Sequence, residues 1–289
     1  MPLLAVLKRL TLAGAAAALT AACTPLSLFA TLSPKDPSSL AARDQAYGAG
    51  PRQRLDVYAP PGAKGQAPVA VFFYGGSWDS GRRQDYGWVG RAMASRGFVT
   101  IVADYRIYPE VRYPVFLTDG AQAVKWAQDH AREYGGDPDR IVLAGHSAGA
   151  YNAVMLGLDG RYLRAAGVDP RKIKAVAGVA GPYDFLPFDD PIAKRIFGKT
   201  DDPPATQPMA YVTKDSPAAF LATGDADTLV YPRNTTALAK KLREAGVPVE
   251  ERHYPGVGHV RILLALSRPL RSEAPVLEEM TEFLRKHAE

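Results

Sequence analysis

The sequence predicts an α/β fold with a mostly parallel central sheet and helices on both faces. Short apolar runs such as 69–73 and 141–144 are typical of strands that are buried on both faces. Segments of helical spacing, such as 148–158, alternate with these runs. No internal repeat is present. Strands that alternate with helices predict a parallel sheet covered on both sides.

The expected elements follow one another from Arg52 onward. Alternating apolar and polar residues at 55–58 predict an edge strand. The later strands are expected at 69–73, 98–103, 141–144, 173–179, 218–223 and 249–253, and the helices at 86–96, 117–132, 148–158, 235–245 and 275–286. One stretch, 182–217, breaks this rhythm with many prolines and aromatics. Because a loop this long is usually functional, we expect a lid or part of a substrate pocket there.

Composition excludes two classes of protein. The 289 residues are 47% hydrophobic and 22% charged, which is ordinary for a globular chain and unlike a disordered one. The net charge is +5, and the longest basic groupings are the pairs Arg82-Arg83 and Lys240-Lys241. Nucleic-acid binding usually needs a clustered basic face, so no nucleic-acid partner is expected.

The first 22 residues predict a signal peptide. Lys8 and Arg9 precede an uncharged run of 13 residues, Leu10–Ala22, which is too short to span a membrane. The run ends in small residues before Cys23, the single cysteine, and so resembles a bacterial lipoprotein signal. The resemblance implies lipidation of Cys23, export and a membrane anchor. Two other readings stay open: a plain signal peptide cut after Ala22, or a buried helix with an incidental cysteine.

Residues 23–50 are predicted to be a tether between this anchor and a domain at 51–289. Pro25, Pro34, Pro37 and two serines at 38–39 disfavour packed structure. The tether would give the domain reach from the membrane.

The motif Gly145-His146-Ser147-Ala148-Gly149 matches G-x-S-x-G between an apolar strand and an Ala-rich helix. This context predicts a sharp strand-to-helix turn that exposes the hydroxyl of Ser147 as a nucleophile. Such a hydroxyl needs a base, and the base needs an orienting carboxylate.

The base and acid should follow the serine in loops after later strands, in the order Ser, Asp, His. Of the five histidines, only His259 lies in a loop after the last expected strand. Two aspartates, Asp225 and Asp227, follow the strand at 218–223. We expect Asp227 to be the acid and Asp225 to hydrogen-bond within the turn. His146 is expected to pack against the sheet beside the serine.

From Arg52 to the C-terminus, the chain resembles the carboxylesterase branch of the α/β-hydrolase superfamily, which includes hormone-sensitive-lipase-like and arylformamidase-like enzymes. Three segments carry the resemblance: an acid loop at 224–230, a D-Y-R-x-x-P-E segment at 104–110, and 73–78, which is similar to the H-G-G-G-W oxyanion loop. The resemblance implies that the backbone N–H groups of Gly76, Ser77 and Ala148 bind the oxyanion. Tyr74 stands where the family usually has His, Ser77 where it often has Gly, and His146 where lipase-like members commonly have Asp.

The leading hypothesis is a serine hydrolase that cleaves small carboxylic esters through an acyl-enzyme, with no metal and no organic cofactor. Ser147 would attack the carbonyl, His259 would move the proton, and Asp227 would orient the imidazole. Tyr74, Trp78 and Tyr183 are the expected substrate-binding residues, because aromatics near the site suit an apolar or aryl ester. An amidase or arylformamidase would use the same residues. A non-catalytic surface lipoprotein that uses the fold for binding is the alternative from another class.

Overall fold

The computed structural model describes residues 25–289. The predicted signal peptide (1–22) and Cys23 lie outside the described residues. The described strands are β1 (Ser39–Ala46), β2 (Arg54–Ala59), β3 (Ala67–Phe73), β4 (Val99–Ala103), β5 (Gly136–His146), β6 (Ile173–Val179), β7 (Ala218–Gly224) and β8 (Val249–Tyr254). The α-helices are α2 (Pro25–Leu32), α3 (Gly87–Ala94), α4 (Val115–His130), α5 (Ala148–Leu158), α6 (Gly160–Ala165), α7 (Pro191–Phe197), α8 (Arg233–Glu244), α9 (His259–Leu264) and α10 (Val276–His287). Six short 3₁₀ helices join them: η1 (Arg83–Tyr86), η2 (Ala131–Tyr134), η3 (Pro170–Lys172), η4 (Pro204–Thr206), η5 (Pro208–Tyr211) and η6 (Arg268–Glu273).

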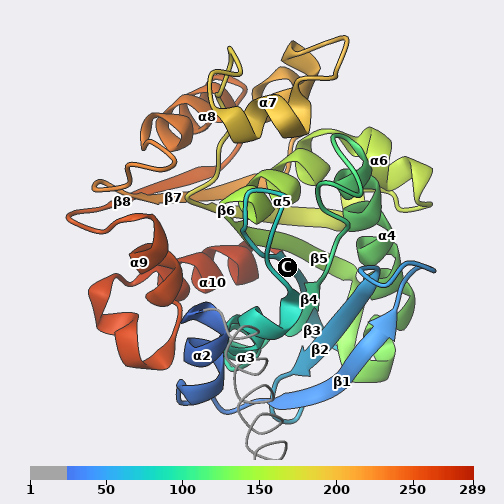
Figure 1. Cartoon of the computed structure of the whole chain (residues 1–289). Helices are drawn as coiled ribbons and strands as arrows, with labels where there is room; N and C mark the ends of the chain where they lie inside the picture. The colour runs from blue at the N-terminus through green and yellow to red at the C-terminus, as the bar shows by residue number, and fades with distance from the viewer. Residues whose placement is uncertain (1–24) are drawn as a thin grey trace, which may run out of the picture.

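The strands of the described chain form one sheet in the order β1-β2-β4-β3-β5-β6-β7-β8 (Figure 1). The strands from β4 to β8 run parallel, whereas β2 is antiparallel to both of its neighbours. Helices α3 and α10 pack on one face, and α4, α5 and α8 pack on the other. The predicted α/β fold is therefore confirmed, and the arrangement is that of an α/β hydrolase.

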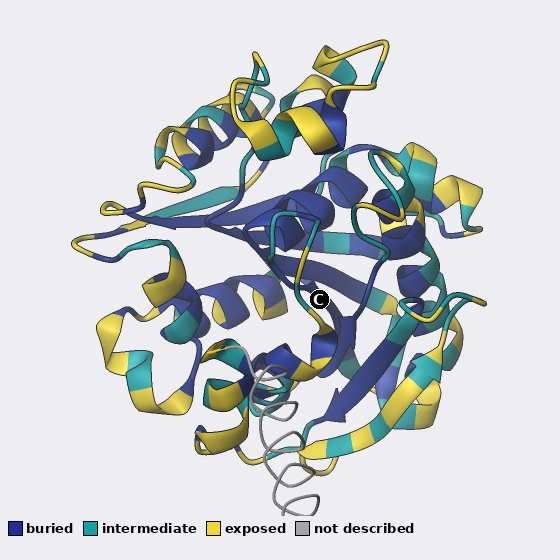
Figure 2. Cartoon of the chain, viewed as in Figure 1, coloured by how far each residue is buried: buried dark blue, intermediate teal, exposed yellow. Residues whose placement is uncertain are grey.

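The central strands are buried on both faces, because their residues are almost all apolar. Figure 2 shows them in dark blue between helices whose outer faces are exposed. Strands β3, β6 and β7, together with residues 141–144 of β5, present mostly Val, Ala, Leu, Ile and Phe to both layers, as a doubly covered parallel sheet requires. The structure thus has one continuous core along the middle of the sheet.

The N-terminal part of the predicted tether is folded, so that prediction is wrong for residues 25–46. Helix α2 begins at Pro25 and rests its Phe29 ring edge-on against Trp88, 5.4 Å between ring centres. Strand β1 pairs with β2, and Asp44 in β1 forms an ion pair with Arg83. These tertiary contacts outweigh the local preference of Pro and Ser for irregular chain. Among the described residues, folded structure is thus already present at Pro25, well before residue 51.

This N-terminal addition also changes the expected edge of the sheet. The strand predicted as an edge, at 55–58, lies within β2 and has partners on both sides. The edge is β1, in which exposed residues alternate with partly buried ones. The alternating pattern at 55–58 thus belongs to the strand next to the edge, because β1 pairs with β2 on its outer side.

Candidate active site

Ser147 occupies a sharp turn between β5 and α5. Its backbone has φ 55° and ψ −124°, a conformation that non-glycine residues rarely adopt. Two residues later, Gly149 packs so closely that a Cβ there would lie 2.0 Å from the carbonyl oxygen of Phe73. Glycine at 149 therefore lets α5 approach β3, and the tight turn places the Ser147 hydroxyl at the carboxyl end of the sheet.

The hydroxyl of Ser147 lies within hydrogen-bond distance of the predicted base. Ser147 Oγ is 2.9 Å from His259 Nε2, and His259 Nδ1 is 2.7 Å from Asp227 Oδ2. His259 is the first residue of α9, just after β8, and Asp227 follows β7. The structure thus brings together three side chains from the ends of three strands, in the spatial order that the sequence predicts.

The carboxylate of Asp227 is held from both sides. Its Oδ1 accepts hydrogen bonds from the backbone N–H groups of Leu229 (2.9 Å) and Val230 (2.8 Å). Burial alone would raise the pKa of Asp227, but the hydrogen bonds from His259 and from these two amides hold the pKa below its ordinary value. The carboxylate is therefore ionised at neutral pH. These two amides are not among the sequence predictions, although an aspartate that binds N–H groups two and three residues onward is a common turn pattern.

Three backbone N–H groups are available for an oxyanion. Within the described residues, the N–H groups of Gly76, Ser77 and Ala148 make no hydrogen bond. The loop backbone has positive φ at Gly76 (125°), Ser77 (52°) and Trp78 (57°). The carbonyl oxygen of Gly76 accepts from the N–H groups of Asp79 and Ser80, both at 3.0 Å, and this fixes the loop. The arrangement supplies free donors from the ends of β3 and β5, beside the nucleophile.

Tyr74 does not line the site, so its prediction as a substrate-binding residue is wrong. The side chain has no exposed surface, and its hydroxyl donates to Asp104 Oδ1 (2.8 Å) and accepts from Arg52 (3.0 Å). Its ring stacks on Tyr105, 4.9 Å between centres. The side chain therefore ties the start of the loop after β3 to Asp104, Arg52 and Tyr105.

Tyr183 and Trp78 are also turned into the protein. Tyr183 is fully buried, and its hydroxyl lies 1.9 Å from where a Cβ on Gly178 would stand, so the ring points into β6. The predicted contact of Tyr183 with substrate is therefore wrong in this structure. Trp78 is 6% exposed and donates its Nε1–H to Asn152 Oδ1 at 3.0 Å. It is the first member of an aromatic cluster beside the oxyanion loop.

The segment 182–217 contributes to that cluster. It contains α7, η4 and η5, and Phe197 of α7 packs edge-on against Trp78, 5.0 Å between ring centres. Phe188 stacks on Phe197, and Phe185 packs against the same ring at a tilt of 57°. The segment therefore supports the loop that carries Trp78 through aromatic packing.

His146 is buried between the serine turn and the base. Its ring centre lies 4.9 Å from that of His259, and its Nε2–H donates to the backbone carbonyl oxygen of His259 at 3.1 Å. Its Nδ1 has no partner in the described structure and faces Gly75, where a Cβ would lie 3.0 Å away. The side chain thus contacts both the base and the oxyanion loop.

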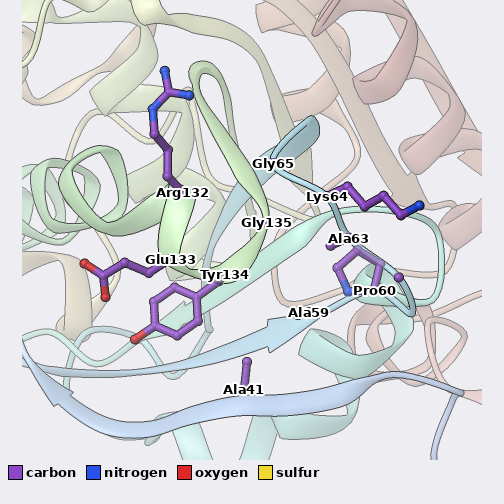
Figure 3. Close-up of a pocket in the computed structure, with 11 residues that line it drawn as sticks. Ala41, Ala59, Pro60, Ala63, Lys64, Gly65, Arg132, Glu133, Tyr134 and Gly135 are labelled. Carbon is purple, nitrogen blue, oxygen red and sulfur yellow. The ribbon is translucent and has the colours of Figure 1, made fainter.

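A surface hollow elsewhere does not coincide with this chemistry. Figure 3 shows it between the loop that carries Lys64 and the 3₁₀ helix η2, which carries Arg132 and Tyr134. These two segments precede β3 and β5, so the hollow lies at the amino-terminal ends of those strands. Ser147 follows the opposite, carboxyl end of β5. The reacting groups, rather than the hollow, therefore locate the candidate active site.

In residues 25–289, no three His, Cys, Asp or Glu side chains are grouped so as to hold a metal ion. None of the helices in this part of the chain is both long and apolar enough to cross a membrane.

Comparison with known proteins gives esterases. The chain is 29% identical over 269 residues to a probable isoprenylcysteine alpha-carbonyl methylesterase, ICMEL1, of Oryza sativa subsp. japonica, covering 84% of this chain and 62% of that protein. It is 30% identical over 270 residues to the esterase LipQ of Mycobacterium tuberculosis, covering 83% of this chain and 61% of LipQ. The chain thus spans about three fifths of the length of these two curated relatives.

Solved structures agree on the fold. A truncated carbohydrate esterase from gut microbiota superposes with a TM-score of 0.76 at 22% identity, covering 89% of this chain and 99% of that one. Esterase 2 of Thermogutta terrifontis, with butyrate bound, gives a TM-score of 0.70 at 24% identity, covering 85% and 94%.

The family model that matches covers residues 55–242, well over half of the chain. This region runs from β2 through Ser147 and Asp227 to the last turn of α8. With the sheet order and the serine turn described above, the match shows that the chain belongs to the BD-FAE family.

Proposed function

We propose that the protein is a carboxylic ester hydrolase that works through an acyl-enzyme on Ser147. The observation that carries the proposal is the continuous hydrogen-bonded line from Ser147 Oγ through His259 to Asp227. Free N–H groups beside the serine support it. The esterase names of the relatives agree with it.

The geometry supports a two-step reaction. Ser147 Oγ attacks the ester carbonyl carbon while His259 Nε2 takes its proton, and the N–H groups at 76, 77 and 148 receive the negative oxygen. The tetrahedral intermediate then expels the alcohol, which takes the proton from His259. A water molecule repeats the sequence on the acyl-enzyme and releases the acid. The ionised Asp227 stabilises the imidazolium of His259 in both steps.

The test compares the wild type with Ser147→Ala on p-nitrophenyl esters of graded acyl length. We expect the wild type to turn over short esters, and kcat of the variant to fall by about 10⁶-fold, as in comparable triads. Quenched wild-type enzyme should carry the acyl mass on the peptide that contains Ser147. Turnover that survives in Ser147→Ala, or an acyl group on another residue, would contradict the proposal.

An aryl-formamide assayed in parallel distinguishes the amidase alternative, because the same residues serve either leaving group. A kcat/KM for the formamide far above that of every ester would make the protein an amidase. Absence of Ser147-dependent turnover on both substrate types would favour the non-catalytic binding protein. We expect ester turnover to exceed formamide turnover.

We also propose that the chain is exported and anchored to a membrane through a lipid on Cys23. The support is the basic and apolar pattern of residues 8–22 before a single cysteine. Full-length protein expressed in a bacterium should partition into the detergent phase, and Cys23→Ala should not. A wild type found wholly in the aqueous phase, with no acyl mass on its N-terminal peptide, would refute the anchor.

A further inference from the structure

Large apolar side chains gather on the surface beside the acid and the base. Among the described residues, five large apolar side chains are exposed: Leu28, Leu32, Leu229, Tyr231 and Val260. Three of the five lie within four residues of Asp227 or directly after His259. We call Leu229, Tyr231 and Val260 the apolar rim; their exposed fractions are 67%, 57% and 59%.

The members of the apolar rim come from two segments that one carboxylate joins. The two oxygens of Asp227 bind different partners: one binds the His259 ring at 2.7 Å, the other the Leu229 N–H at 2.9 Å. The Leu229 backbone therefore lies close to the His259 imidazole, and Val260 is the next residue of α9. The Ala226 N–H also donates to the Val257 carbonyl oxygen at 3.1 Å, which holds the two segments together.

The direction of the reaction decides which part of a substrate meets this surface. The carbonyl oxygen must point to the N–H groups at 76, 77 and 148, on the β3 side of Ser147. The alcohol oxygen must reach His259 Nε2, because that atom protonates the leaving group. The substituent on the alcohol oxygen therefore extends over the residues that flank His259.

Those residues offer little to a polar alcohol. In the segments 227–231 and 256–260, the acidic and basic side chains are Asp227 and His259, which bind each other, and Thr228 adds one exposed hydroxyl. The charged residues just outside these segments, Asp225 and Arg261, are paired with His253 and Glu273. A sugar carries several hydroxyl groups and would lose more hydrogen bonds to water there than the Thr228 hydroxyl could replace. An apolar chain or ring would bury surface against Leu229, Tyr231 and Val260.

We propose that the apolar rim binds the alcohol part of the ester, so that the enzyme prefers esters of apolar alcohols to esters of polyols and sugars. This inference rests on the proposed ester hydrolysis at Ser147. It assigns the leaving-group specificity of that site to side chains that take no part in the chemistry.

The experiment uses butyrate esters that differ only in a primary alcohol: methyl, hexyl and the 6-hydroxyl of glucose. Primary alcohols leave with similar intrinsic ease, so differences in kcat/KM report binding of the alcohol part. Burial of each methylene group should raise kcat/KM by about fourfold. If two methylenes of the hexyl chain are buried, kcat/KM for hexyl butyrate should exceed that for methyl butyrate by about tenfold or more. The glucose ester should fall below the hexyl ester. All esters are kept below their solubility limits.

The double variant Leu229→Ser/Val260→Ser should lower the hexyl-to-methyl ratio of kcat/KM by about fivefold, because it removes apolar contact area. The matched control is Leu28→Ser/Leu32→Ser on α2, whose leucines are 54% and 72% exposed and should leave the ratio unchanged. Both double variants change only exposed side chains, so folding should be preserved.

The outcomes separate this inference from the proposed function. Ser147-dependent hydrolysis of methyl butyrate, with a hexyl-to-methyl ratio near one or a preference for the glucose ester, would overturn the inference alone. An equal fall of the ratio in both double variants would also overturn it. Failure of Ser147-dependent hydrolysis on all three esters would instead reject the proposed function.

Discussion

The Nε2–H of His146 donates a hydrogen bond to the backbone carbonyl oxygen of His259, whose own Nε2 faces Ser147. The residue before Ser147 thus holds the backbone of His259, the proposed base. Burial, reinforced by the nearby His259, lowers the pKa of His146 to about 3. His146 therefore stays neutral at working pH, and it adds no positive charge beside His259 when His259 becomes protonated.

Replacement of His146 tests this role in positioning the base. His146→Leu removes the donor, so we expect kcat to fall by about tenfold or more with little change in KM, since small displacements of catalytic groups are costly. His146→Gln keeps an amide N–H near the position of Nε2 and should retain most activity. The measurement is kcat per mole of folded enzyme. If both variants have the kcat of the wild type, His146 does not position His259.

The same histidine predicts a dependence of stability on pH. The pKa of His146 is lower in the folded protein than the 6.5 of the free side chain, so the unfolded chain binds more protons between those values. Stability should therefore be unaffected by this group above pH 6.5, and should fall below it by up to about 1.4 kcal/mol per pH unit. His146→Gln cannot take up this proton. Denaturant unfolding at pH 7 and pH 4.5 should show the variant losing less stability than the wild type, and equal losses would contradict the argument.

Replacement of the two aspartates of the acid loop should affect kcat to very different extents. Asp227 is buried and binds His259, whereas Asp225 is exposed and contacts His253 of β8 at 3.1 Å. Asp227→Asn should lower kcat by about 10⁴-fold, the usual cost of removing the orienting carboxylate. Asp225→Asn should stay near the wild type. Steady-state kinetics with circular dichroism as the folding control decides the matter, and the opposite ranking would refute the assignment.

Tyr74→Phe should affect stability more than activity. The hydroxyl lies in a buried cluster with Asp104 and Arg52, and Asp104 keeps its contacts with Arg83 when the hydroxyl is lost. We expect a loss of about 1–3 kcal/mol in the free energy of unfolding, with kcat close to the wild type. If a folded Tyr74→Phe enzyme lost about 10²-fold in kcat, the hydroxyl would have to act on the oxyanion directly.

The candidate site was predictable because its groups follow strand ends. Ser147, Asp227 and His259 each come just after a strand, and parallel strands bring such residues to one edge of the sheet. Their proximity in the structure follows from that order, whereas their catalytic roles stay predictions until the variants are measured.

Other features could not be predicted because they depend on partners distant in sequence. Tyr74 belongs to the oxyanion loop, but its side chain turns inward to Asp104 and Arg52, which lie 30 and 22 residues away. Strand β1 has no clear apolar pattern. It is stabilised instead by its pairing with β2 and by the ion pair between Asp44 and Arg83. Local composition carries no signal for either arrangement.

The early start of α2 has a consequence for how far an anchored enzyme can act. Pro25 is already helical and Phe29 is packed on Trp88, and Cys23 lies two residues before Pro25 in the sequence. One residue spans about 3.5 Å. An enzyme with a lipid on Cys23 would therefore stay close to the lipid headgroups. It could rotate about the anchor but could not move far from the membrane surface. Esters dissolved in or attached to the membrane surface would meet it at high local concentration, whereas esters on distant structures would have to diffuse to it.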